Sequence, residues 1–326
     1  MAYTAIDNPE LYFQTVLYTG TGSSNAVTFD GDEDMAPDMV WLKNRNSTQN
    51  HFLTNSVTAN EFIIVNLSNA ADTNAGYTQT YDSDGFTLQS SAIAMNTDTN
   101  TYVAWCWKES ATSGFDIVSY TGNGTTQDIS HSLSAKPDFM ILRLRSGSGG
   151  WLVYHSSLGA TKAIYLNETG AVGTNSSGFN DTEPTSSVFS LGNGAYANTS
   201  DGTQIAYCFA EKQGYSKFGS YTGNGDDDGT FCFTGFRPAR VMLKSTAAAT
   251  NWQIMDNKRN TFNPVDLNLK ADANAADEDF DIIDMLSNGF KLRYSSDANV
   301  SGNTIIYMAF AEAPFVNSNG VPCNAR

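Results

Sequence analysis

The acidic clusters of this sequence hold the side chains best suited to binding a metal ion. Asp30, Asp32 and Asp34 alternate along one short stretch, and further acidic runs follow at 82–84 and 226–228. Ca²⁺ takes six to eight oxygen ligands, often from aspartates spaced by two. The EF-hand pattern is incomplete, because no glutamate stands at its twelfth position. Charge runs are usually solvated, so the pattern favours a loop without a cofactor, with calcium as the alternative reading.

Nucleophilic catalysis needs a base beside the nucleophile, and histidine is scarce in this chain. The sequence has only His51, His131 and His155, and none recurs in all three copies of the internal repeat described below. A Gly-x-Ser-x-Gly elbow is also missing. We therefore expect no enzyme activity. A glycosidase-type carboxylate pair depends on a distance in space that a sequence does not give, so a polysaccharide depolymerase stays as a less favoured hypothesis.

Aromatic side chains are the other candidates for binding, because they offer large amphipathic contact faces. All five tryptophans lie in predicted strands. Trp41 and Trp105 differ from the rest, because the other copies of the repeat do not all keep an aromatic residue at those places. Trp41 and Trp105 are therefore the better candidates for an exposed platform that binds a glycan, although a tryptophan in a strand is more often buried.

The elements that must position these residues follow an internal repeat, which is the first feature to look for in any sequence. The stretch Tyr-Thr-Gly-x-Gly begins at 18, 120 and 221, so its copies are 102 and 101 residues apart. Other landmarks recur in the same order and phase. The landmarks are Tyr18, Tyr120, Tyr221, Pro37, Pro137, Pro238, Phe86, Phe189 and Phe290. The chain therefore reads as three tandem copies of one unit of about 100 residues, the usual size of a domain.

Within each copy, short runs with period-two alternation are separated by turn residues, which indicates strands. At 39–43, for example, Val40 and Leu42 alternate with Met39 and Trp41. Breaks every 8–12 residues or so are typical of a β-sandwich or barrel. The sequence thus predicts an all-β protein with domains at 1–112, 113–213 and 214–326, the first with an N-terminal lead-in and the last with a C-terminal tail.

Charge and hydropathy exclude several classes of partner. The net charge is −16, and an acidic chain is repelled by phosphate backbones and by anionic membrane surfaces. No apolar run approaches the length of a membrane helix, and the N-terminus lacks the features of a secretory signal. We therefore expect no nucleic-acid partner and no membrane insertion. We expect the protein to be made in a host cytoplasm.

Four motifs carry a resemblance to a known family. They are YTGNG at 221–225, GFRP at 235–238, SNGFKL at 287–292 and YMAFAEAPF at 307–315. Together they resemble a repeat family of tailed-bacteriophage virion proteins, commonly labelled tail fibre or virion structural protein. The resemblance covers nearly the whole chain and is loosest in the first repeat. It implies lectin-like or jelly-roll-like β-sandwich repeats located in a virion, and it brings no catalytic residues.

The favoured hypothesis is a non-enzymatic structural protein on the particle exterior, as a tail appendage or as an attachment protein for a host surface glycan. A capsid decoration protein is the alternative. Other virion proteins are the expected partners. One chain with three repeats could imitate a trimer, but equivalent positions such as Trp41, Ile141 and Met242 differ. This difference favours separate duties for the repeats and assembly of the chain as a homotrimer.

Overall fold

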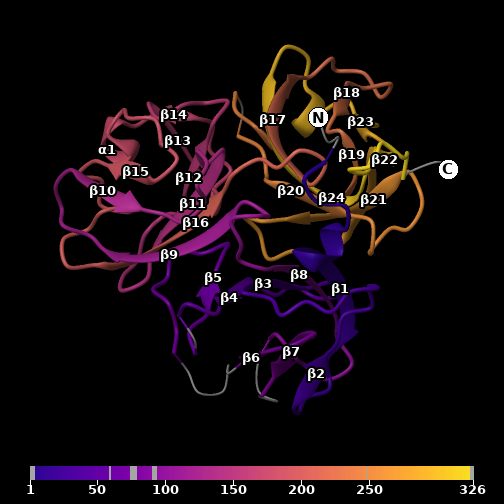
Figure 1. Cartoon of the computed structure of the whole chain (residues 1–326), viewed down its shortest axis with the longest axis horizontal. Coiled ribbons are helices and arrows are strands. Elements are labelled where there is room, and N and C mark those ends of the chain that lie inside the picture. The colour runs from indigo at the N-terminus through magenta and orange to yellow at the C-terminus, as the bar shows by residue number, and fades with distance from the viewer. Residues whose placement is uncertain (1–3, 59, 74–78, 90–93, 248, 324–326) are drawn as a thin grey trace.

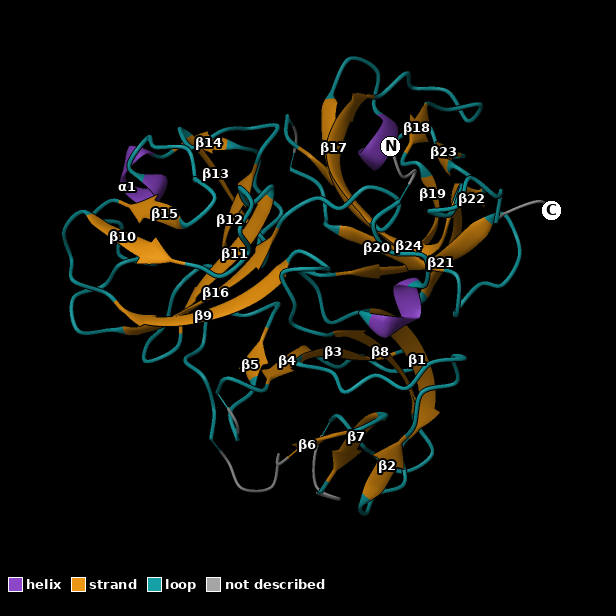
Figure 2. Cartoon of the chain, viewed as in Figure 1, coloured by secondary structure: helices purple, strands orange, loops and turns teal. Residues whose placement is uncertain are grey.

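The computed structural model describes residues 4–58, 60–73, 79–89, 94–247 and 249–323. Strands make up 44% of the structure and helix 3%, so the prediction of an all-β protein is confirmed. All pairings between named strands are antiparallel, and they form sheets from three successive groups of strands, here called units 1, 2 and 3. Figure 2 shows strands and loops almost throughout, with helix confined to short turns. The domain boundaries stay a prediction.

Unit 1 follows a single helical turn, η1 (Pro9–Leu11), and has two facing sheets in the order β1-β8-β3-β4-β5 and β2-β7-β6. Its strands are β1 (Phe13–Thr19), β2 (Asn25–Val27), β3 (Met39–Asn44), β4 (His51–Asn55), β5 (Ile63–Ile64), β6 (Gln79–Asp82), β7 (Gly85–Leu88) and β8 (Thr101–Trp107).

Unit 2 repeats this arrangement, with β14-β13-β12-β11-β16-β9 as the larger sheet and β10-β15 as the smaller. Its elements are β9 (Phe115–Thr121), β10 (Gln127–Ser130), β11 (Phe139–Leu144), β12 (Leu152–His155), β13 (Lys162–Tyr165), β14 (Gly173–Thr174), α1 (Ser176–Phe179), β15 (Val188–Leu191) and β16 (Thr203–Phe209).

Unit 3 joins the corresponding strands into one sheet in the order β17-β24-β19-β20-β21-β22-β23-β18. Its elements are β17 (Ser216–Thr222), β18 (Phe231–Phe233), β19 (Phe236–Ser245), β20 (Gln253–Asp256), β21 (Val265–Lys270), β22 (Glu278–Leu286), β23 (Gly289–Leu292), η3 (Asp297–Asn299) and β24 (Thr304–Pro314).

The repeated tyrosine fixes the turn after the first strand of each unit. The hydroxyls of Tyr18, Tyr120 and Tyr221 donate to backbone carbonyls 77 residues downstream, at 2.7, 2.7 and 2.6 Å. The first glycine of each turn lies against the backbone of the same downstream segment. A Cβ at Gly20 would lie 2.1 Å from Thr97 O, so this close approach requires glycine.

Four hydrophobic clusters fill the part of the molecule that the structure describes. Three of them each belong to one unit, and their residues include Phe86, Phe189 and Phe290, which are fully buried. The fourth cluster draws its residues from all three units. The units are therefore joined by a shared core as extensive as their own, rather than by flexible linkers.

The three units close into a ring in which each contacts the other two. Backbone hydrogen bonds at corresponding places run from unit 1 to unit 2, from unit 2 to unit 3 and from unit 3 to unit 1. They join Ala71 N to Arg145 O (2.8 Å), Val172 N to Thr246 O (3.0 Å) and Asp277 N to Arg45 O (2.8 Å). Figure 1 shows the resulting three lobes around a common centre, with unit 1 at the bottom, unit 2 on the left and unit 3 at the upper right.

One aromatic ring from each unit meets the other two at this centre. Trp107, Phe209 and Phe310 stand at equivalent positions, because they pair with equivalent residues of β3, β11 and β19. Their ring centroids are 5.6–6.4 Å apart, within the usual range for aromatic pairs. The shared core thus has an approximate three-fold axis.

Candidate functional site

Trp41 and Trp105 are buried, and the prediction that they are exposed is wrong. Their exposed fractions are 1% and 0%. The indole N–H of Trp105 donates to Asp256 Oδ2 of unit 3 at 3.0 Å, and the guanidinium of Arg240, also from unit 3, lies 5.2 and 5.0 Å from the two rings. Their residue types vary between repeats because each position faces a different neighbouring unit. Neither ring can stack on a glycan.

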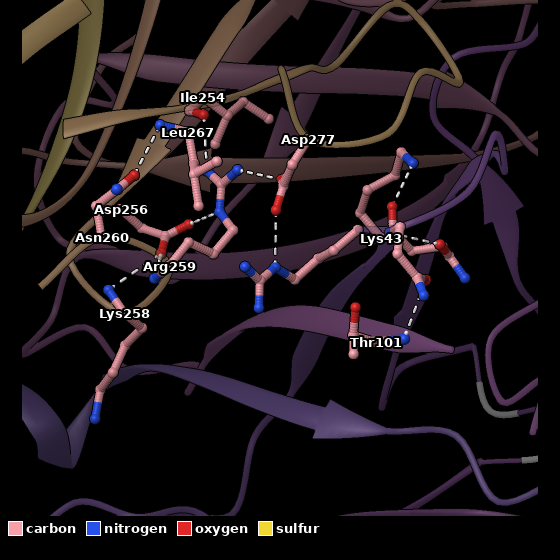
Figure 3. Close-up of polar contacts among 12 residues, drawn as sticks. Lys43, Thr101, Ile254, Asp256, Lys258, Arg259, Asn260, Leu267 and Asp277 are labelled. Carbon is pink, nitrogen blue, oxygen red and sulfur yellow. Dashed lines mark hydrogen bonds and ion pairs between the residues drawn. The ribbon is translucent and has the colours of Figure 1, made fainter. Parts of the chain in front are cut away.

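The charged residues around these tryptophans form an internal clamp between units 1 and 3. Arg259 is bound by Asp256 at 2.6 Å and by Asp277 at 2.8 Å, and Asp277 also binds Arg45 of unit 1 at 2.9 Å. Figure 3 shows Arg259 between the two carboxylates. Burial lowers the pKa of Arg259, and the two aspartates more than offset this effect. Because the guanidinium is enclosed, the clamp holds the ring together rather than binding a substrate.

The histidines lie apart from one another. Burial lowers the pKa of His51 and lowers that of His155 to about 4, so both rings are neutral in the folded chain near pH 7. His51 Nδ1 accepts from the Trp41 indole, and His155 Nε2 lies 3.2 Å from Tyr307 O in unit 3. His131 Nε2 lies 3.2 Å from Thr185 O. His51 and His155 therefore serve the packing of the fold, whereas the His131 contact lies at the surface.

The acidic stretch at 30–34 does not gather into a ligand cluster. Asp30 forms an ion pair with Lys258 of unit 3 at 2.9 Å, and the backbone N–H of Asp32 donates to Glu10 Oε2 at 2.9 Å. Across the residues that the structure describes, no group of three or more His, Cys, Asp or Glu side chains could hold a metal ion. The calcium reading of Asp30, Asp32 and Asp34 gains no support from this geometry.

Four of the exposed aromatic residues in the described chain are phenylalanines of unit 3, which the sequence reasoning missed, and another, Tyr196, lies in unit 2. Phe231, Phe233, Phe262 and Phe315 have exposed fractions of 44, 59, 81 and 37%. Scattered apolar side chains on a surface are ordinary, but apolar side chains gathered in one region mark interaction sites. This region is the best candidate for a binding surface.

Two depressions lie beside these phenylalanines. One, of about 410 Å³, is lined by Arg237, Thr261, Phe262, Asn263, Met285, Leu286, Ser287 and Asn288. The other, of about 220 Å³, is lined by Glu211, Gln213, Ser216, Lys217, Phe233, Thr234, Gly235, Phe315 and Val316. They are neighbours, because Asn288 O accepts from Thr234 N at 3.0 Å and from Gly235 N at 3.2 Å. Arg237 and Glu312 form an ion pair beside them.

The strand register gives the counterparts of Phe231 and Phe233 in the other units. Cys232 pairs with the buried Phe290, as Val27 pairs with Phe86 and Ile129 with Phe189. The flanking residues therefore correspond as follows: Phe231 to Ala26 and Asp128, and Phe233 to Thr28 and Ser130. Once the strand register is known, a position-by-position comparison of the three copies singles out both phenylalanines.

Comparison with protein families assigns the chain to one of them. Residues 8–314 match a family described as a domain of unknown function, DUF7483. The chain belongs to this family. The match spans all three units of the DUF7483 ring together, and it includes Phe231, Phe233 and Phe262. No curated protein matches the chain. Among the described parts of this DUF7483 protein, no helix is long and apolar enough to cross a membrane.

Proposed function

We propose that this DUF7483 protein is a non-enzymatic structural protein on the exterior of a bacteriophage particle, where it serves as a tail appendage or host-attachment protein. The observation that carries the proposal is the closed ring of three β-sandwich units around one shared core. Such a ring is a rigid platform that presents surfaces to partners. The virion assignment itself rests on the motif resemblance at 221–225, 235–238, 287–292 and 307–315.

The burial of most histidines and cysteines supports a non-catalytic role. His51, His155 and Arg259 are enclosed by protein, as are Cys106 and Cys208, whose thiol pKa values burial raises. A catalytic nucleophile needs an activating base and access to substrate. These groups lack that access, and they serve the packing of the fold.

The approximate three-fold axis favours one alternative, a capsid decoration protein. Capsid surfaces offer local three-fold sites, and a single chain with three equivalent lobes could occupy one. Trp41, Ile141 and Met242 are buried in the shared core, so their differences say nothing about the outer surface. The homotrimer stays a prediction. A single chain already has three lobes, so three-fold symmetry does not require three chains.

Gold-labelled antibody against the purified chain, imaged on particles of a phage that encodes it, tests the proposal. We expect label on the particle exterior. Label along the tail supports the attachment role, and label over the head supports the decoration role. Absence of the chain from purified particles by mass spectrometry would refute the virion proposal. Release of reducing sugar from host polysaccharide by the purified chain would refute the non-enzymatic part.

A further inference from the structure

Strand β18 leaves one edge of the unit 3 sheet open. It is the last strand in the sheet order, and within the described residues it pairs with β23 and with no other strand. Cys232 points into the core, whereas Phe231 and Phe233 point outward. An open edge with apolar side chains is a template for another strand, and proteins usually protect such edges.

The fold does not need phenylalanine at either position. Unit 1 has Ala26 and Thr28 there, and unit 2 has Asp128 and Ser130, in strands with the same register against the same buried phenylalanine. Unit 3 thus exposes two large apolar side chains at positions where units 1 and 2 have small or polar ones. If the sandwich needed large apolar side chains here for packing, all three units would have them. The two phenylalanines therefore have a role that is particular to unit 3.

The C-terminal segment extends this apolar surface rather than covering it. Phe315 N donates to Gly235 O at 3.2 Å, and Phe315 lines the same depression as Phe233. The segment is held in place, because Cys323 N donates to Phe315 O at 3.1 Å and Ser318 N donates to Asp7 Oδ1 at 2.6 Å. The surface formed by Phe231, Phe233 and Phe315, here called the phenylalanine surface, therefore remains exposed.

The acidic side chains beside β18 favour a positively charged binding partner. Asp226 and Asp227 are exposed just before β18, and neither forms an ion pair with a described residue, whereas Asp228 is paired with Lys291 and Arg293. A cationic segment would find its counter-charges there. A second copy of this chain is disfavoured, because each copy carries a net charge of −16 and like charges oppose association.

We propose that β18 binds an extended segment of another protein by strand addition. In this mode, backbone hydrogen bonds give affinity and alternate side chains give specificity. The segment has apolar side chains that pack on the phenylalanine surface, and lysine or arginine at the end that meets Asp226 and Asp227. The proposal concerns the purified chain and holds whether or not the protein belongs to a virion.

Binding of a labelled eight-residue peptide of alternating lysine and valine, measured by fluorescence anisotropy, tests the proposal. We expect saturable binding that weakens with salt, and at least tenfold weaker binding of the matching glutamate–valine peptide. The lysine–valine peptide with N-methyl groups on alternate residues should lose binding, because it lacks donors along one edge. Equal binding of the N-methylated peptide would overturn strand addition, and equal binding of the acidic peptide would overturn the charge assignment.

Variants locate the site. The double variant Phe231→Ala/Phe233→Thr introduces the residues of unit 1, so its melting temperature should stay unchanged while peptide affinity falls at least tenfold. Tyr196→Ala removes an exposed aromatic side chain of unit 2, far from β18 in the sequence, and should leave affinity unchanged. Unaltered binding by the double variant would overturn the proposal. So would a concentration-dependent dimer in sedimentation that the double variant disperses, because that result assigns the edge to a second copy.

Discussion

Replacement of Phe310 by alanine tests whether the shared core joins the three units. Phe310 lies on the approximate three-fold axis with 1% of its surface exposed. The rings of Phe13, Trp107, Phe209 and Tyr215, drawn from all three units, lie 5.1–5.8 Å from it. Phe310→Ala therefore empties a site that each unit helps to line.

The structure sets the size of the expected effect. Removing a buried phenylalanine ring costs about 3–5 kcal/mol, and the cost depends on how far the cavity can collapse. Here the neighbours are rigid rings held by strands from three directions, so we expect the upper half of the range, about 4–5 kcal/mol. At about 2 °C per kcal/mol for a chain of this size, the melting temperature should fall by about 8–10 °C.

Calorimetry gives the shift, and amide hydrogen exchange shows where it acts. The backbone N–H groups of Ala71 and Val172 make the hydrogen bonds at two unit junctions, so Phe310→Ala should speed their exchange. Phe290→Ala is the matched control, because Phe290 is equally buried but belongs to the core of unit 3 alone. It should cost a similar free energy without speeding exchange at the junction between units 1 and 2. A melting shift below about 2 °C, or faster exchange only within unit 3, would refute the reasoning.

Further predictions concern charge and metal. Asp277→Asn removes one carboxylate from the clamp and should lower the free energy of unfolding by about 2 kcal/mol in urea titrations; an unchanged midpoint would contradict the clamp. Burial, followed by a hydrogen bond with Asp116, raises the pKa of Glu109 from 4.5 to about 7. The folded chain then holds this proton more tightly than the unfolded chain, so stability should fall as pH rises from 4.5 to 7, by about 1 kcal/mol after solvent screening. Glu109→Gln should flatten that slope, and a slope unaffected by the substitution would count against it. Chelation by EDTA should leave the melting temperature unchanged; a fall that Ca²⁺ reverses and that Asp32→Asn abolishes would restore the calcium site.

The all-β class could be predicted because period-two alternation and turn residues act within one strand. The same alternation could not show what covers each face. All six residues of β3 are buried, since Val40 and Leu42 face the core of unit 1 while Met39 and Trp41 face the shared core. Strands buried on both faces are expected where layers pack on both sides. The second layer here is another unit, which local patterns do not reveal, and the exposure of Trp41 was misjudged for that reason.

The phenylalanine surface was missed for a related reason. A phenylalanine in a short strand reads as a core residue, and Phe231 and Phe233 flank a core position, Cys232. Only the comparison with Ala26 and Asp128 marks them as unusual, and that comparison needs the register that the sheets provide.

Closing the ring within one chain lets the three units differ where identical subunits could not. A homotrimer of one unit would carry three copies of every surface and three copies of every junction. Here Trp105 meets Asp256 between units 1 and 3, whereas the corresponding place between units 1 and 2 joins Tyr207 to Asn55. Among the described strands, the open edge with Phe231 and Phe233 likewise occurs once. Under the strand addition proposed above, a ring with one such edge would bind one strand, so the covalent link would give a three-fold scaffold a single docking site.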